Sequence, residues 1–411
     1  MAQPAPLGAV RMIASANIMT DLILSLCALI GLGCVYTSLH HQSRDDPITR
    51  RFRFALQVVM LLFAGRALVV MTGGMWFRFP VLLAASLVPL AGLLLAEGLL
   101  RRHAPRAMKI YIAGFAALFA LLSLWYGPSI DPLRLLGLLI YQISGFAMIG
   151  WLVATRDRST LSMAENQSAG RLGWVLIVLV PLIAADFLLI ALRLPVQLSA
   201  IGVLILCWVA LDLVHAVPRH RQSFARAGGK IAVAAVTGLV IGLIGQMGRE
   251  GVILAMALTV AMVLVIAIVE QRYDARRHAP QLIAHIATAP MDTPVGFLRD
   301  LRAHPWVKDA AIIDVAALAG FQPQVLADIF AQYPVLRRSD HAPDDPVMTD
   351  HIAHLFARFD ATHILDTGQV PRQLVALAMP ALHRSPDTEQ ELQALQRIIA
   401  LIAQNGGGDD R

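Results

Sequence analysis

Residues 50–106 decide the fold, and they read RRFRFALQVVMLLFAGRALVVMTGGMWFRFPVLLAASLVPLAGLLLAEGLLRRHAPR. The stretch holds two apolar blocks, at about 54–74 and 80–100, which are separated only by Met75–Phe79. A helix needs about 20 consecutive apolar residues to cross a bilayer. Arginine clusters stand at both outer ends of the stretch. The sequence therefore predicts two membrane-spanning helices joined by a short turn.

The same pattern recurs along most of the chain. Seven further apolar blocks have the length and composition of membrane spans, and polar or basic segments separate them. We expect nine spans, at about 18–36, 54–74, 80–100, 110–126, 135–154, 172–192, 201–217, 231–246 and 252–269. The fold class that follows is an α-helical polytopic membrane bundle with a small α/β domain after it.

The composition agrees with a membrane protein. Of the 411 residues, 57% are hydrophobic and only 15% are charged, whereas soluble chains have about 45–50% and about 25%. The cysteines Cys27, Cys34 and Cys207 all fall inside apolar blocks. They predict buried apolar side chains rather than a disulfide framework or a metal pair.

The loop charges predict the orientation. Lys and Arg concentrate in cytoplasmic loops close to the span ends, and here they alternate through all nine spans. The loops after the second, fourth, sixth and eighth spans have about one arginine each. The basic loops follow the odd-numbered spans and carry Arg44, Arg50, Arg51, Arg53; Arg101, Arg102, Arg106, Lys109; Arg156, Arg158, Arg171; Arg219, Arg221, Arg226, Lys230; and Arg272, Arg276, Arg277. We expect an outside N-terminus, a cytoplasmic C-terminus and a place in the bacterial inner membrane.

Two other readings of the spans stay open. The first block could be a cleaved signal peptide, although it lacks a basic region beyond Arg11 and a small-residue cleavage site. The last two blocks are divided only by Met247–Gly251 and could instead form a re-entrant pair or one bent helix.

The net charge of +6 is the sum of two parts of the chain with charges of opposite sign. Residues 281–411 contain 10 Lys and Arg against 16 Asp and Glu, and the first 280 residues contain 24 against 12. A basic protein often binds nucleic acid, but here the positive charge borders the spans and the soluble part is acidic. We expect the lipid bilayer and a protein as partners, and no nucleic acid.

After the last span the sequence pattern changes from long apolar blocks to short predicted strands and helices. We expect an N-terminal segment at 1–17, a charged connector at 270–280, a cytoplasmic α/β domain at 281–405 and a disordered tail at 406–411. Within the domain, 309–315, 361–366 and 374–379 are predicted strands, and 323–333 and 350–359 are predicted helices. Residues 388–404 form an amphipathic helix with one apolar stripe, made of Leu392, Leu395, Ile398, Ile399 and Ile402.

Ionisable residues inside spans are the first candidates for function, because unpaired charge is costly in hydrocarbon. Arg66 and Asp186 lie twelve and fourteen residues into the second and sixth spans, at heights of roughly 18 and 21 Å. We expect them to face the bundle interior as an ion pair, with Gln142 at a comparable depth. The group is either a ligand or ion site or a structural polar tie between helices.

Three further features could carry function. Asp212 and His215 lie on one face of the seventh span, where they could relay protons, but one histidine is not a haem or metal site. Gly238 and Gly242 form a GxxxG motif that predicts close helix packing, either inside the chain or in a dimer. His351 and His354 are best explained as a solvated helix face. We expect no cofactor, no metal and no catalytic residues.

The layout resembles bacterial polytopic membrane sensors, in which a helical input region leads into a GAF-like or PAS-like cytoplasmic module. The strands of the tail and its closing helix, 388–404, carry the likeness. It implies a protein that detects a membrane or periplasmic signal and passes it to a partner, with homodimerisation through 388–404. A transporter or channel, and a non-catalytic subunit of a larger complex, are the alternatives.

Overall fold

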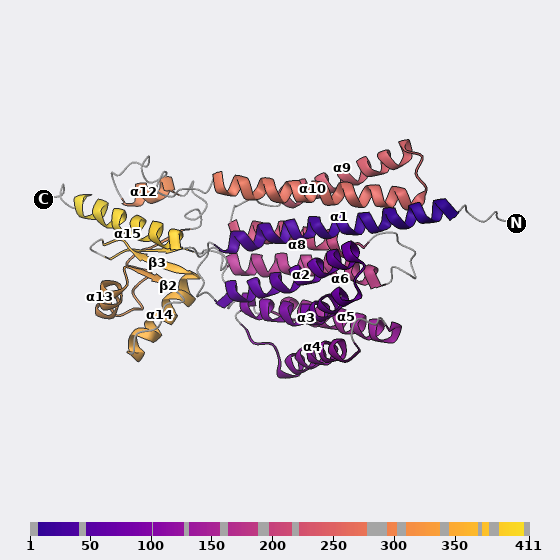
Figure 1. Ribbon diagram of the computed structural model, residues 1–411. Helices are drawn as coiled ribbons and strands as arrows, with labels where there is room; N and C mark the ends of the chain where they lie inside the picture. The colour runs from indigo at the N-terminus through magenta and orange to yellow at the C-terminus, as the bar shows by residue number, and fades with distance from the viewer. Residues whose placement is uncertain are drawn as a thin grey trace. The chain divides into compact units, whose positions relative to one another are not determined.

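The protein divides into two compact units, which are described separately (Figure 1). The first comprises Met1–Arg156, Ala169–Val214 and Arg219–Asp274, and the second comprises Asp157–Ser168, His215–Pro218 and Ala275–Arg411. The structure is a computed structural model. It describes residues 7–40, 47–100, 102–126, 131–156, 163–187, 197–215, 222–277, 294–301, 310–337, 345–368, 372–377 and 386–406.

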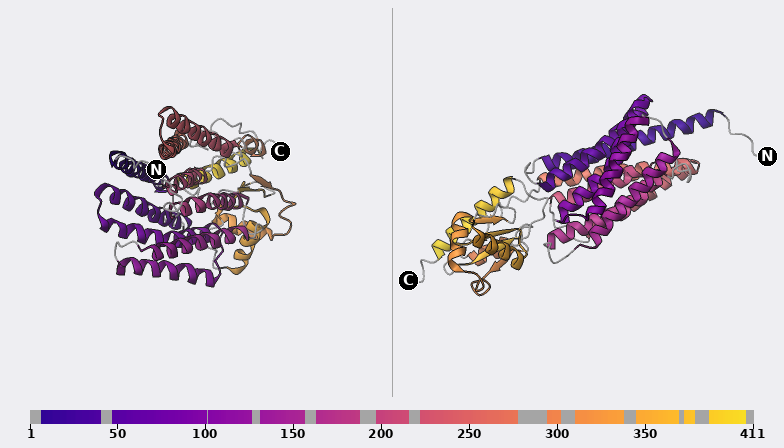
Figure 2. Two further views of the ribbon diagram at one scale, coloured as in Figure 1. Left: turned by 90° about the vertical axis from the view of Figure 1, so that its right-hand side faces the viewer. Right: turned by 90° about the horizontal axis from the view of Figure 1, so that it is seen from below.

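Long helices run side by side in the first unit (Figures 1 and 2). Six helices in the described part of the chain are long and apolar enough to cross a membrane, and three more have shorter apolar stretches. The helices are α1 (Leu7–His40), α2 (Pro47–Thr72), α3 (Arg78–Leu100), α4 (Arg106–Tyr126), α5 (Pro132–Ala154), α6 (Met163–Phe187), α8 (Ser199–His215), α9 (Gln222–Ile244) and α10 (Arg249–Arg277).

Large apolar side chains remain on the outside of this unit. On α4, Ile110 is 72% exposed, Leu121 63% and Trp125 86%. Water would make such a surface expensive, because a helix that is apolar on all sides belongs in a protein core or in a bilayer. Lipid tails can cover these side chains without cost. The first unit is therefore a helical membrane bundle.

Small residues set the spacing of the helices in the bundle. A Cβ atom at Gly65 of α2 would lie 2.8 Å from the Val81 side chain of α3. A Cβ at Gly145 of α5 would lie 2.9 Å from the ring of Pro89, in the middle of α3. In a bilayer the hydrophobic effect does not press helices together, so such close packing supplies the attraction. The helix α3 thus contacts both α2 and α5.

The helices extend beyond the expected spans in several places. The helix α1 begins at Leu7 rather than at 18, and α2 begins at Pro47 rather than at 54. The helix α10 continues to Arg277, so most of the expected connector is helical. The reason is that apolarity marks only the part of a helix inside hydrocarbon, whereas a helix continues into the interface as long as its backbone groups pair internally. The end of the sixth expected span lies outside the described residues.

The α9–α10 hairpin shows how the GxxxG motif is used. A Cβ at Gly238 would lie 2.5 Å from the Met256 Cα, and one at Gly242 would lie 2.9 Å from the Val252 Cα. The Thr259 hydroxyl donates to the Ala234 carbonyl across the same interface, at 2.9 Å. The motif therefore packs α9 against α10 inside the chain.

A helix-ending turn separates α9 from α10. The Met247 N–H donates to the Gly242 carbonyl and the Gln246 N–H to the Leu243 carbonyl, with Gln246 at a φ of 49°. These two bonds make a Schellman motif, which ends a helix. The alternative of one bent helix is therefore wrong for this segment.

The second unit contains a four-stranded antiparallel sheet of order β1-β4-β3-β2. Its strands are β1 (Ala311–Ile313), β2 (Val335–Arg337), β3 (His363–Asp366) and β4 (Leu374–Leu377), and its helices are α12 (Pro294–Leu301), α13 (Pro323–Gln332), α14 (Pro346–Phe359) and α15 (Pro386–Gly406). The expected strands and helices are present, and β2 and α12 were missed. β2 has only two apolar residues, Val335 and Leu336, and α12 has only eight residues, so neither shows a pattern long enough to predict it.

Helices cover both faces of this sheet. Along β4, Val375 and Leu377 pack with α12 and α15, whereas Leu374 and Ala376 pack with the α13 and α14 side. This alternation is what a strand buried on both faces requires. The apolar stripe of α15 is buried in the core, with Leu392, Leu395 and Ile399 at 0% exposure. The stripe therefore covers the sheet, and the expected homodimer through 388–404 stays a prediction that requires another face of α15.

The substitution Gly238→Leu tests the hairpin contact. Its side chain would meet the α10 backbone, so the two helices must separate, and we expect a loss of about 1–3 kcal/mol in the free energy of unfolding. Gly228→Leu on the same helix is the matched control, because a Cβ there meets nothing within 4 Å. Thermal unfolding in mild detergent measures both. Equal melting temperatures for the two variants would contradict the contact.

Candidate functional site

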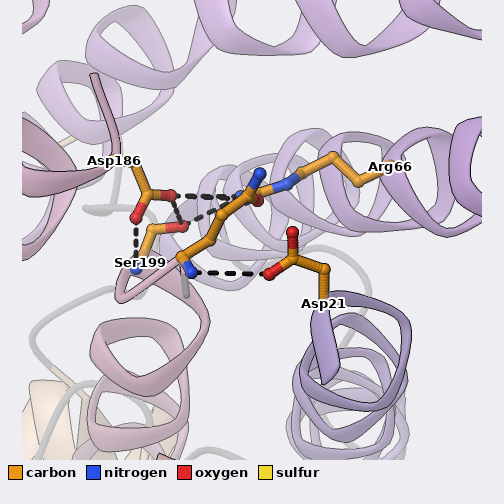
Figure 3. Close-up of polar contacts among 5 residues, drawn as sticks. Asp21, Arg66, Asp186 and Ser199 are labelled. Carbon is orange, nitrogen blue, oxygen red and sulfur yellow. Dashed lines mark hydrogen bonds and ion pairs between the residues drawn. The ribbon is translucent and has the colours of Figure 1, made fainter. Parts of the chain in front are cut away.

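An ion pair inside the membrane bundle joins α2 to α6. The Arg66 Nη2 lies 3.3 Å from the Asp186 Oδ2, and the Arg66 Nη1 lies 3.4 Å from the same oxygen. The two residues are 120 positions apart in the chain. Both side chains are mostly buried, with 16% and 13% exposure. The ion pair expected from the sequence is confirmed (Figure 3).

Ser199, the first residue of α8, completes this pair. The Arg66 Nη1 donates to the Ser199 hydroxyl at 2.9 Å, and that hydroxyl donates to the Asp186 Oδ2. The Ser199 backbone N–H also donates to the Asp186 Oδ1, at 3.1 Å. The first N–H groups of a helix have no partner within the helix, and an anion there is favoured by the helix dipole. Asp186 therefore neutralises Arg66 and also caps α8.

A second carboxylate belongs to the same cluster. The Asp21 Oδ1, from α1, accepts a hydrogen bond from the Gln197 N–H at 3.4 Å (Figure 3). Sequence reasoning missed Asp21, Gln197 and Ser199. The signal for Asp21 was present, because it is an acid three residues into the first expected span. Gln197 and Ser199 lie just before the seventh expected span, where polar residues are common and do not by themselves indicate a site.

The cluster forms one wall of a cavity of about 450 Å³. Most of the lining is aliphatic, and the polar atoms come from a few side chains. The lining residues are Asp21, Ser25, Leu62, Arg66, Val69, Val70, Arg78, Val81, Leu82, Ala85, Val88, Leu135, Leu138, Gln142, Ile183, Asp186, Gln197 and Ser199. The cavity lining thus contains three of the five residues expected in a polar core or ligand site within the membrane, Arg66, Gln142 and Asp186, and does not include Asp212 or His215.

Gln142 lies in this lining but is only half satisfied. Its Nε2 donates to the Ala85 carbonyl at 2.9 Å, which ties α5 to α3. Its Oε1 accepts no hydrogen bond from any residue that the structure describes, although the side chain is only 4% exposed. A buried amide oxygen without a donor costs about 1–3 kcal/mol. Because this oxygen has almost no accessible surface, it is a local cost of the fold and not a contact open to the cavity.

Several polar residues of the cavity lie at helix ends. Ser199 begins α8, and Arg66 and Asp186 lie near the ends of α2 and α6, whereas Asp21 lies near the middle of α1. Arg78 is the first residue of α3. Because α2 and α3 run in opposite directions, the end of one lies beside the start of the other. The cavity therefore occupies the end of the bundle that contains the α2–α3 turn.

The remaining candidates lie elsewhere. Asp212 and His215 belong to α8, but their side chains lie outside the described part of the structure. Gly238 and Gly242 pack α9 on α10, away from the cavity lining. In the second unit, the rings of His351 and His354 lie 6.1 and 5.0 Å from that of Phe321. Among the described residues no group of three or more possible metal ligands is found.

No protein-family model matches the chain, and neither a curated protein nor a solved structure is significantly similar to it. The chemistry of the site therefore has to be inferred from its own residues.

Removing one member of the ion pair should lower the free energy of unfolding of the bundle more than removing both members. Arg66→Gln leaves Asp186 buried without a counterion, and we expect a loss of about 3–5 kcal/mol in the free energy of unfolding. The double variant Arg66→Gln/Asp186→Asn should recover part of this loss, since no charge is then left unpaired. Unfolding in mild detergent measures each variant.

The exposed pair Lys230–Glu270, at 3.4 Å, provides the control. Its side chains are 56% and 59% exposed, so Lys230→Gln should change the free energy by about 1 kcal/mol at most. Additive losses in the Arg66 and Asp186 double variant would mean that the two charges do not stabilise one another.

Proposed function

We propose that the protein is a bacterial inner-membrane receptor that binds a small molecule in the bundle cavity and signals through its C-terminal unit. The cavity itself supports this proposal. Its volume of about 450 Å³ lies in the range of small-molecule sites, which are mostly apolar with a few convergent polar groups. The guanidinium of Arg78, which makes no hydrogen bond or ion pair among the described residues, is such a group.

The connection between the units suits a signalling role. The helix α10 runs without interruption from Arg249 to Arg277, past the last apolar residues and into the segment where the second unit begins. A continuous helix transmits a displacement along its length, whereas a flexible linker would absorb it. We propose that ligand binding shifts α10 and that a partner protein reads this shift.

The proposal includes a finer architecture. Nine spans with an outside N-terminus are supported by the alternation of loop charge and by the helices α1 to α10. A GAF-like C-terminal module is supported by the antiparallel sheet and by its closing helix α15. In this orientation the cavity opens in the outer half of the membrane, where a periplasmic molecule could reach it.

A carrier is the second candidate, because a cavity that reaches Arg66 and Asp186 is also what a transporter would need. The two functions differ in their consequence. A carrier moves its ligand across a vesicle membrane, whereas a receptor changes its C-terminal unit without net transport. Flux in proteoliposomes and hydrogen exchange in α12–α15 distinguish them.

Purification in mild detergent, followed by mass spectrometry of co-purifying small molecules, tests the binding site. We expect a specific molecule at near one-to-one ratio, and Val69→Trp should displace it because Val69 lines the cavity. The neighbouring Leu68→Trp is the control, since Leu68 is 39% exposed and lies outside the lining. A molecule retained equally by both variants, or none in the wild type, would contradict the site.

Labelling of single cysteines tests the orientation. In a chain with Cys27, Cys34 and Cys207 replaced by alanine, an impermeant maleimide should label Met75→Cys and Gly248→Cys in intact cells, but not Thr155→Cys. The first two positions follow even-numbered spans and the third follows an odd-numbered one. Labelling of Met75→Cys without Gly248→Cys would mean that α9 and α10 do not cross fully.

A further inference from the structure

The polar atoms of the cavity lining fall into two groups, one with all its hydrogen bonds satisfied and one with unused donors and acceptors. Arg66, Asp186 and Ser199 satisfy one another through the bonds described above. The other polar residues of the lining are Asp21, Ser25, Arg78, Gln142 and Gln197. Of these, Arg78 and Asp21 are charged and have charged atoms that are not used in hydrogen bonds among the described residues.

Arg78 provides a positive charge that has no anionic partner among the described residues. It lines the cavity, and within the described part of the chain it makes no hydrogen bond or ion pair. A guanidinium stays charged at any physiological pH, and its planar fork matches a carboxylate or a phosphate. Arg78 is therefore suited to an anionic group of a ligand.

Asp21 provides an acceptor without a donor. Among the described residues only one oxygen of its carboxylate, Oδ1, accepts a hydrogen bond, from the Gln197 N–H. The other oxygen can accept a hydrogen bond from a ligand N–H, and beside a carboxylate an ammonium group is the strongest such donor.

The charges of the lining add up to zero, since Arg66 and Arg78 stand against Asp21 and Asp186. A ligand with a net charge would leave an uncompensated charge inside the bundle, which is expensive. A zwitterion would leave no uncompensated charge. Its apolar part would contact the aliphatic lining, which includes Val69, Val70 and Leu138.

We infer that the cavity binds a zwitterionic, partly apolar small molecule, with its anionic group on Arg78 and its ammonium group on the Asp21 Oδ2, which accepts no hydrogen bond among the described residues. This inference rests on the proposed receptor function and deepens it. A volume of about 450 Å³ holds roughly 15 water-sized groups at about 30 Å³ each. A branched apolar amino acid fits, and so does the headgroup of a zwitterionic lipid.

Binding of leucine and two matched analogues to the full chain in detergent tests the inference by calorimetry. Isocaproate lacks the ammonium group of leucine, and isoamylamine lacks its carboxylate. We expect leucine to bind at least about tenfold more tightly than either analogue, because a charged hydrogen bond contributes about 1.5–3 kcal/mol.

Variants assign each end of the ligand. Arg78→Gln should weaken leucine binding about tenfold and leave isoamylamine binding unchanged, and Asp21→Asn should weaken the binding of leucine and isoamylamine but not of isocaproate. Arg249→Gln and Glu250→Gln are the controls, because both residues are exposed and lie outside the lining.

Lipid nanodiscs distinguish the two sources of a zwitterion. If a lipid headgroup is the ligand, native mass spectrometry should retain phosphatidylethanolamine over phosphatidylglycerol, and Arg78→Gln should abolish that preference while leucine fails to bind. Isocaproate that binds as tightly as leucine would overturn the zwitterion, as would failure of both leucine and phosphatidylethanolamine. The receptor proposal then still stands if another molecule co-purifies and Val69→Trp displaces it, and it falls as well if none does.

Discussion

A guanidinium cannot enter hydrocarbon alone, and the arrangement of the bundle end that holds Arg66 follows from this constraint. Arg66 on α2 requires an anion, which Asp186 on α6 supplies. Asp186 in turn accepts the first N–H of α8 through Ser199, and Asp21 on α1 accepts the N–H of Gln197 just before it. Four helices from distant parts of the chain are thereby tied together, because each polar group in the membrane must find its partner within the protein.

The cavity beside this cluster has the opposite character. Arg66, Asp186 and Ser199 satisfy one another, and closed polar networks make a bundle rigid and specific. Among the described residues, Asp21 keeps one carboxylate oxygen without a hydrogen bond and Arg78 has an unpaired guanidinium. A rigid wall with unused polar atoms beside it is pre-organised for a ligand, since little must be ordered when the ligand binds.

The second unit places a limit on how a signal could leave the protein. Its sheet is covered on both faces, and the apolar stripe of α15 contributes to that core. A partner would therefore have to contact other surfaces of this unit. Interfaces of transient complexes are about as polar as the rest of a protein surface, so an acidic domain of this kind does not need an apolar patch to be recognised.

The sequence by itself determined the class of fold, because the length of an apolar block is a direct consequence of the thickness of hydrocarbon. It also predicted the Arg66–Asp186 pair and the depth of Gln142, since the cost of buried charge marks these residues and the rise of a helix places them. It did not reveal Ser199, Gln197 or Arg78, because polar residues near span ends are common and only their neighbours in space give them a role. It left the purpose of Gly238 and of the α15 stripe open, since a small-residue motif or an apolar face does not name the surface that it packs on. Gly238 packs on Met256, the α15 stripe packs on β3 and β4, and the cavity cluster joins Arg66 to Asp186, 120 positions away. Only the tertiary structure decided these contacts.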